Sequence, residues 1–257
     1  MSNPTNTSLK SWYDDRYKNN IWYGMFYHAE EAMAIESAIP TREWVKKDVI
    51  DLGCGVGDLS MRLHQHGAIV LGIDYSEEAV RICKSRYPNP PNIGISFEQQ
   101  NILTVKGKWD VAVSQGTLEH LDYPYEAMHY VMENLLVPNG KFIFSCPNFV
   151  NPRGYVSLAM EAFAGQRVGG SDIHWIFPGD VHNFALEHNY TLKFKTCDED
   201  WGCGGAFLYD MKYRFKDNPN VDQTKVEYLI ERLNKLLCVD KPTAVNGATA
   251  IYTLSKK

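Results

Sequence analysis

A glycine-spaced turn after the first strongly apolar stretch of the chain is the clearest candidate for a ligand site. In residues 49–57 an apolar strand leads into Gly53, Gly55 and Gly57, with Asp51 just before them. Glycine lets the backbone turn sharply and approach a ligand closely, and a helix that begins after the turn presents free N–H groups. The pattern therefore predicts that a polar or anionic ligand binds at this turn.

The spacing of these glycines differs from that of pyrophosphate-binding turns. Dinucleotide-binding folds carry Gly-x-Gly-x-x-Gly, and here Asp58 stands in the place of the third glycine. A carboxylate there would lie beside a pyrophosphate of the same charge. The sequence therefore argues against NAD and against a nicotinamide-dependent oxidoreductase.

An acidic residue stands 21 positions beyond Gly53, at the end of the second predicted strand. Asp74 follows the apolar run 70–73, and a carboxylate at this place can accept both hydroxyl protons of a ribose. The alternative is that Asp74 caps the next helix, but Ser76 already supplies that cap. We therefore interpret Asp74 as a ribose ligand that faces the glycine turn.

The elements that position these residues alternate along the chain in the manner of an α/β protein. Short β-branched runs between helical patterns predict a parallel sheet with helices on both faces. Strands are expected at 48–52, 68–73, 95–100, 109–114, 141–146, 191–196 and 249–254. Helices are expected at 59–66, 77–87, 125–136, 155–164, 178–188 and 223–237. Two aromatic-rich helices at 8–38 belong to a helical N-terminal cap, residues 1–44, ahead of a main domain, 45–257, with an insertion at about 147–175 after the fifth strand.

Composition narrows the partners that this chain could have. A formal net charge of −5 without a basic run gives no attraction to a polyphosphate, so we expect no nucleic-acid partner. Neither a secretory signal nor an apolar stretch of about 20 residues is evident, so we expect no membrane insertion. The six cysteines show no Cys-x-x-Cys spacing, which favours a reduced, cytoplasmic protein and no metal site.

Taken together, five features resemble the class I S-adenosylmethionine-dependent methyltransferase family. They are the glycine motif, Asp74, Asn101-Ile102, the turn 118–120 and Pro138-Asn139-Gly140 before a strand. Within the family they look most like the branch that methylates small metabolites, including the ubiquinone-biosynthesis type. The resemblance implies a Rossmann-like, seven-stranded, mostly parallel sheet whose last strand is antiparallel, with donor and acceptor meeting at the carboxyl ends of the strands.

The resemblance also implies a set of cofactor contacts along those strand ends. Asp51 and the three glycines would frame the methionine portion of S-adenosylmethionine, and Asp74, followed by Tyr75, would hold the ribose. Asn101 stands where the family usually has an Asp that accepts from the adenine amino group, and an amide oxygen can do the same. Ile102 would cover the adenine, and Gln115 would lie near the methionine.

The sequence indicates the residues that would assist methyl transfer less specifically than those that would bind the cofactor. Methyl transfer requires in-line alignment of donor and acceptor, and a hydroxyl acceptor must also lose a proton. His120, directly after the fourth strand, and His174, in the segment Ser171–Trp175, are the candidate bases, although His120 belongs to a turn that also serves structure. We expect the acceptor pocket to be lined by Tyr13, Tyr17, His174 and Trp175. The alternative for the aromatic helices is that they form a cap that only packs on the core.

These observations predict a methyltransferase that acts on an oxygen, or a nitrogen, of a small molecule. The alternative is a protein of the same fold that binds the cofactor as a regulatory or scaffolding subunit and transfers no methyl group. Cys146-Pro147-Asn148-Phe149 does not support base or glutamine methylation, because the amine-methylating signature follows the fourth strand and not the fifth. We expect a monomer or a homodimer.

Overall fold

A single seven-stranded sheet forms the centre of the described part of the chain. A computed structural model describes residues 6–19, 25–88, 94–165, 172–215, 222–237 and 247–257. Its strands are β1 (Asp48–Leu52), β2 (Ile69–Asp74), β3 (Ile95–Gln99), β4 (Trp109–Ser114), β5 (Leu136–Pro147), β6 (Tyr190–Cys197) and β7 (Thr249–Lys256). They lie in the order β3-β2-β1-β4-β5-β7-β6, and β7 pairs antiparallel with both of its neighbours. The predicted seven strands and antiparallel last strand are therefore confirmed.

Alternating side chains give the sheet two buried faces. Ile50 and Leu52 of β1 join one apolar cluster, whereas Val49 of the same strand joins the other, because successive side chains of a strand point to opposite faces. Phe142 and Phe144 of β5 lie in the first cluster as well. A sheet that is apolar on both faces must be covered on both, and here each face has its own helices.

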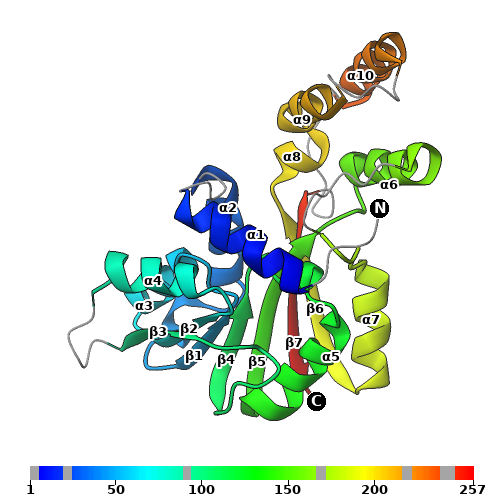
Figure 1. The fold of residues 1–257 in the computed structure, drawn as a ribbon. Helices are drawn as coiled ribbons and strands as arrows, with labels where there is room; N and C mark the ends of the chain where they lie inside the picture. Colours follow the sequence, from blue (N-terminus) through cyan, green and yellow to red (C-terminus); the bar gives the residue numbers. More distant parts are fainter. Residues whose placement is uncertain (1–5, 20–24, 89–93, 166–171, 216–221, 238–246) are drawn as a thin grey trace.

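Helices cover the sheet in two layers, as Figure 1 shows. One layer contains α2 (Met25–Glu36), α3 (Asp58–Gln65) and α4 (Glu77–Arg86), whose apolar residues fill the cluster around Val49. The opposite layer contains α5 (Pro124–Tyr130), its continuation η3 (Val131–Leu135) and α7 (Pro178–Glu187). The predicted α/β architecture with helices on both faces is thus confirmed, with element ends that mostly shift by one or two residues.

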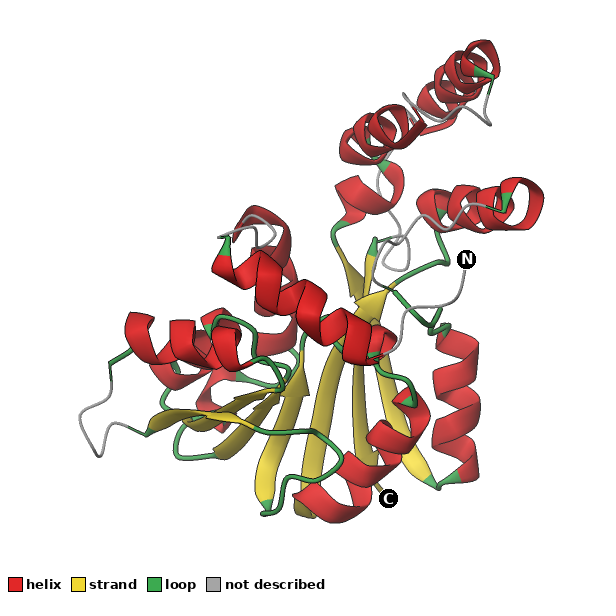
Figure 2. Ribbon diagram, in the orientation of Figure 1, coloured by secondary structure: helices red, strands yellow, loops and turns green. Residues whose placement is uncertain are grey.

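The first helix, α1 (Asn6–Lys18), crosses the carboxyl ends of the central strands and belongs to neither layer (Figure 2). It packs against α4, and the Ser76 hydroxyl at the start of α4 donates a hydrogen bond to the Asp14 carboxylate. Two helices were predicted in this part of the chain, and both are present. The aromatic residues Trp22 and Tyr23, together with Ser171 of the predicted acceptor segment, lie outside the described residues.

A separate group of helices lies beyond the carboxyl edge of the sheet. It consists of α6 (Pro152–Ala164), α8 (Glu199–Cys203), α9 (Gly205–Phe215) and α10 (Gln223–Leu237) (Figure 1). Phe207, Met211 and Phe215 of α9 form a small core with Val226 of α10, and Val156 of α6 packs against it. Helix α6 lies in the predicted insertion, and α10 has the predicted bounds.

One expectation about local structure was wrong, and two helices lie where none was predicted. These helices, α8 and α9, lie within residues 199–215. The fifth strand was expected from residue 141, but pairing with β4 already begins at Leu136 and resumes at Lys141 after an irregular Pro138-Asn139-Gly140. The turn residues therefore form a bulge within the paired strand, with Asn139 at φ 65°.

Within the described ranges, no helix is both long and apolar enough to cross a lipid bilayer.

Candidate functional site

The glycine turn lies at the carboxyl end of β1, where backbone conformation and close packing both require glycine. Gly53, Gly55 and Gly57 have φ values of 76°, 53° and 84°, in the region that L side chains rarely adopt. A Cβ on Gly53 would lie 2.5 Å from the Thr117 side chain, and one on Gly57 would lie 3.0 Å from the Phe97 ring. Gly57 then directly precedes α3, so the free N–H groups of that helix begin at the turn.

Asp74 joins the end of β2 to this turn. Its Oδ2 accepts from the Gly55 N–H at 3.0 Å and its Oδ1 accepts from the Ser76 N–H at 2.9 Å. A carboxylate offers about four lone-pair positions, so each oxygen keeps capacity for a ligand hydroxyl. Burial raises the pKa of Asp74 to about 6, and the hydrogen bonds from Ser76 and Gly55 oppose that rise. Ser76 is the helix cap, as expected, because its Oγ accepts from the Ala79 N–H.

Asp51, which was predicted to contact the methionine portion of the cofactor, is buried. It is 1% exposed, and its Oδ2 accepts a 2.5 Å hydrogen bond from the Ser60 hydroxyl of α3. Burial raises the pKa of Asp51 to about 7, opposed by the hydrogen bond from Ser60. The carboxylate therefore ties α3 to the end of β1 beneath the turn, and its contact with the methionine portion of a cofactor stays a prediction.

Asp58, the residue that argued against a pyrophosphate, lies at the first position of α3. Its Oδ1 pairs with the Arg86 guanidinium of α4 at 2.8 Å, and it also accepts from the Tyr87 hydroxyl. Arg86 in turn donates to the Val56 carbonyl at 3.0 Å. The ion pair thereby holds the outer side of the glycine turn against α4.

Helix α1 covers the turn with two tyrosines that were predicted to line the acceptor pocket. The Tyr17 hydroxyl oxygen would lie 3.3 Å from a Cβ on Gly55, and burial together with the Asp74 charge raises the pKa of Tyr17 well above its usual range. The Tyr13 ring stacks on Tyr17 at 6.1 Å between centroids and meets the His120 ring at 5.9 Å. Tyr17 therefore lies over the glycine turn, and Tyr13 links it to His120.

The predicted adenine contacts lie at the end of β3, the next strand outward. The Asn101 Oδ1 accepts from the Leu103 N–H at 2.8 Å, so this oxygen already closes a local turn. Asn101 is exposed, whereas Ile102 is 8% exposed and belongs to the apolar cluster beneath β1. Beside β1 on the other side, the Gln115 amide after β4 donates to the Glu31 carboxylate at 3.1 Å.

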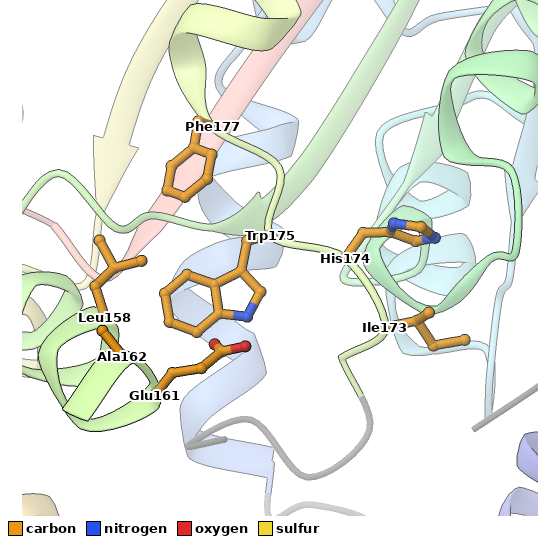
Figure 3. A pocket seen from close by; sticks show the side chains of 7 residues that line it. All are labelled: Leu158, Glu161, Ala162, Ile173, His174, Trp175 and Phe177. Atoms are coloured by element: carbon orange, nitrogen blue, oxygen red, sulfur yellow. The ribbon is translucent and has the colours of Figure 1, made fainter. Parts of the chain in front are cut away.

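His174 and Trp175 point to opposite sides of the segment that carries them (Figure 3). The His174 Nε2 lies 3.1 Å from the Asp122 carbonyl oxygen, which can only accept, so this nitrogen carries the proton. Trp175 stacks on Phe149 at 4.3 Å with an interplanar angle of 12°. It lines an open cleft of about 550 Å³ together with Leu158, Glu161, Ala162, Ile173, His174 and Phe177.

Glu119 is a residue that the sequence analysis missed. It is 3% exposed, and burial together with the charges of Asp172 and Glu31 raises its pKa well above the usual range. The neighbouring His120 Nδ1 lies 3.6 Å from the Asp172 Oδ1. Because Glu119 follows an apolar strand inside a common turn, no spacing signal distinguished it from an exposed helix-start carboxylate.

Comparison with known proteins agrees with this geometry. A family model described as a methyltransferase domain matches residues 45–174, just over half of the chain. The ubiquinone biosynthesis O-methyltransferase of Coxiella burnetii is 32% identical over 142 residues, which are 54% of this chain and 56% of that protein. The protein of the same name from Acinetobacter baylyi is 26% identical over 197 residues, which are 74% of this chain and 77% of that one. The chain thus spans about half the length of the first of these relatives.

Solved structures extend the comparison to the fold. A magnesium protoporphyrin IX methyltransferase from Synechocystis, with bound S-adenosylhomocysteine, has a TM-score of 0.62 at 14% identity and covers 98% of this chain and 99% of its own. The chain belongs to the methyltransferase domain family, and its fold is that of the S-adenosylmethionine-dependent methyltransferases.

The residues present fit S-adenosylmethionine along the carboxyl ends of four neighbouring strands. In sheet order β3-β2-β1-β4, these ends carry Asn101, Asp74, the glycine turn and Gln115. An amide, an acceptor-only carboxylate, a glycine turn that a ligand can approach closely and a second amide thus follow one another in the order of adenine, ribose and methionine in the cofactor. Tyr17 closes the donor side above Gly55, where any larger residue would meet its hydroxyl.

Proposed function

We propose that this chain transfers a methyl group from S-adenosylmethionine to an oxygen of a small molecule. The observation that carries the proposal is the acceptor-only carboxylate of Asp74, bonded to Gly55 at the carboxyl edge of the sheet beneath Tyr17. S-adenosylmethionine supplies an electrophilic methyl group on a positively charged sulfur. The work left to the protein is to hold the donor, align the acceptor and exclude water.

The donor side of the site is formed by α1 and the ends of β1 to β4. Asp74 would accept from the ribose hydroxyls, Asn101 would meet the adenine amino group, and Tyr75, partly buried beside Asp74, would flank the ribose. Gly53, Gly55 and Gly57 would admit the methionine portion close to the backbone. Tyr17 would shield this portion from solvent, which is a different role from the acceptor contact expected of it.

The acceptor side follows β4 and includes the segment at residues 172–177. His120 stands beside the Tyr13 ring, and Glu119 lies buried behind it. Trp175, which stacks on Phe149, and Phe177 offer apolar ring surfaces at the open cleft (Figure 3), which suits an acceptor with an aromatic or extended apolar part. Oxygen is favoured over nitrogen because the relatives described above are named O-methyltransferases.

His120 is the better placed of the two predicted bases. His174 is engaged through Nε2 with the Asp122 carbonyl and turns away from Trp175, so we propose that it positions the acceptor segment. His120 lies next to Asp172 and below α1, where donor and acceptor sides meet. A net charge of −5 agrees with a small-molecule acceptor in the cytoplasm and with no nucleic-acid partner.

Incubation with labelled S-adenosylmethionine and a library of hydroxylated small metabolites tests the proposal. The expected result is a labelled methyl ether together with S-adenosylhomocysteine in equal amount, absent with Asp74→Ala. Transfer only to protein or RNA would contradict a small-molecule acceptor. Tight binding of S-adenosylhomocysteine without transfer to any acceptor would favour the regulatory or scaffolding alternative.

A further inference from the structure

Two cysteines from separate elements meet at the glycine turn. Cys54 lies within the turn, Cys83 lies in α4, and both are free thiols. The Cys83 thiol donates a hydrogen bond to the Gly55 carbonyl oxygen at 3.2 Å, and the Cys54 Sγ lies 3.9 Å from the same oxygen. The two side chains are also hydrogen-bonded to each other. The thiols therefore lie side by side at one backbone carbonyl.

The packing of α4 against the turn keeps the two sulfur atoms together. Cys83 is fully buried and Cys54 is 8% exposed, and both belong to the apolar cluster around Val49. A Cβ on Gly57 would lie 3.1 Å from the Cys83 Sγ, so this sulfur contacts the turn at a second place. The hydrogen bond from Arg86 to the Val56 carbonyl holds α4 to the same turn. The pair is therefore prearranged by the fold.

We propose that Cys54 and Cys83 are a site of oxidation, at which a hydroperoxide forms a disulfide that links the glycine turn to α4. The Cys54 sulfur is the more exposed of the two, and it attacks one oxygen of the peroxide. The O–O bond breaks, one water leaves, and Cys54 becomes a sulfenic acid. The Cys83 sulfur then attacks the Cys54 sulfur, an S–S bond of about 2.0 Å forms, and the sulfenic oxygen leaves as a second water.

The two steps balance without any group beyond the peroxide. The thiols lose two protons and two electrons, and the peroxide takes up both and is reduced to two molecules of water. A dithiol reductant reverses the reaction by exchange with the disulfide. The sequence analysis favoured reduced cysteines because no two of them have Cys-x-x-Cys spacing. The partner of Cys54 lies instead on the helix that follows the next strand, where only the fold shows it.

The surroundings of Cys54 set the rate of its oxidation. The hydrogen bond with Cys83, burial, and the charges of Asp51 and Asp74 raise the pKa of Cys54 well above its usual range. The thiolate is the form that attacks a peroxide, so oxidation should be slow at neutral pH and faster in alkaline solution. Tyr17 lies over the neighbouring Gly55 and restricts access further, which leaves a small hydroperoxide as the fitting oxidant.

Oxidation should change cofactor binding, and this part of the proposal rests on the proposed function. The disulfide removes the S–H group that donates to the Gly55 carbonyl, while the N–H of the same residue is bonded to Asp74. Drawing Cys54 toward α4 therefore alters the turn that would receive the methionine portion of the cofactor. Bound cofactor would in turn cover Cys54, so the empty donor site is the form that is oxidised.

Peptide mass spectrometry detects the disulfide directly. The reduced full-length chain is treated with hydrogen peroxide near neutral pH and at about pH 8.5, alkylated, and digested with trypsin without reduction. Trypsin places Cys54 in the peptide 48–62 and Cys83 in the peptide 82–84. We expect these peptides to be joined, more completely at the higher pH, and separated again by dithiothreitol. Cys54→Ser and Cys83→Ser should abolish the joined peptide, whereas Cys203→Ser in α8 is the matched control and should retain it.

Calorimetry with S-adenosylhomocysteine then tests the consequence. The oxidised wild type should bind about tenfold more weakly than the reduced wild type, with recovery after dithiothreitol, and peroxide should leave the affinity of Cys83→Ser unchanged. Prior saturation with S-adenosylhomocysteine should slow formation of the joined peptide.

The outcomes separate the site from its effect. Separate peptides in peroxide-treated wild type, or Cys54 joined to a different cysteine, would overturn the site, and this measurement needs no variant to fold. A complete disulfide with unchanged affinity would overturn the effect on cofactor binding. A joined peptide in a chain that binds no S-adenosylhomocysteine even when reduced would support the site and count against the proposed function.

Discussion

The Asp74 carboxylate accepts a hydrogen bond from the Gly55 N–H at 3.0 Å and thereby joins the ends of two neighbouring strands. The same carboxylate accepts from the Ser76 N–H at the start of α4. One side chain thus fixes the shape of the glycine turn before any ligand arrives. Since each of its oxygens keeps capacity for a further hydrogen bond, the group that shapes the turn is also the one proposed to bind the ribose.

Asp74→Asn should therefore weaken both cofactor binding and the fold. An amide keeps the volume but places an NH₂ group against one of two backbone N–H groups, at a cost of about 1–3 kcal/mol in unfolding free energy. Calorimetric affinity for S-adenosylhomocysteine should fall by about tenfold or more, since one ribose contact is lost as well. The control Asp58→Asn breaks an exposed ion pair with Arg86 and should change affinity little. Equal losses in both variants would contradict the role of Asp74.

The free energy of unfolding should fall as the pH rises from about 4 to 7. Burial raises the pKa of Asp51 to about 7 and of Asp74 to about 6, so the folded chain holds protons that the unfolded chain releases. Stability then decreases with pH, because the folded state binds more protons over this window. Each pKa unit corresponds to about 1.4 kcal/mol.

Urea denaturation at several pH values checks this dependence. Asp51→Asn should flatten the slope between pH 4 and 7, because Asn does not titrate. The control is Asp110→Asn. The ion pair with Lys47 lowers the pKa of Asp110, so this carboxyl titrates below the window and its loss should leave the slope unchanged. A curve that rises through the window in wild type would contradict the buried positions of both aspartates.

Binding of the cofactor should depend on α1. Tyr17 lies over Gly55 and Tyr13 stacks on it, so Tyr17→Ala should open the donor side to solvent. We expect faster dissociation of S-adenosylhomocysteine, by about tenfold, measured by stopped-flow fluorescence. Tyr155→Ala, on the exposed side of α6, is the control and should leave the rate unchanged. An unaltered rate in Tyr17→Ala would show that α1 does not cover the bound cofactor.

The two histidines that were candidate bases should respond differently to substitution. His174→Ala removes one hydrogen bond to the Asp122 carbonyl and should lower stability by about 1 kcal/mol while leaving the shape of the pH–rate profile unchanged. His120→Ala should lower kcat and alter that profile, because His120 stands where the donor and acceptor sides meet. Loss of the acidic limb of the profile, where the rate falls as a base becomes protonated, in His174→Ala alone would restore His174 as the base.

Local patterns predicted the sheet and the donor side well. The strand Asp48–Leu52 and the turn after it follow from apolar alternation and glycine spacing within ten residues, and both are observed. Helices α8 and α9 did not follow from pattern, because Gly202, Gly204 and Gly205 lower helix propensity there. Their stability comes from packing of Phe207 and Met211 in a cluster that α6 also contacts.

The acceptor side was harder to predict because it depends on contacts between distant residues. Asp172 belongs beside His120 only through backbone bonds to the Glu119 carbonyl, and nothing local to either segment shows that pairing. In the same way, the spacing of Tyr17 gives its helix face but not the residue which that face meets. The direction in which α1 crosses the sheet decides that Tyr17 meets Gly55.

The helices α6, α9 and α10 have a core of their own, and none of its buried residues belongs to the two clusters of the sheet. Substitutions in that core can therefore accumulate without disturbing the strands that hold the glycine turn. Natural variation and laboratory evolution can then change the packing of these helices while the strands beneath the glycine turn keep theirs.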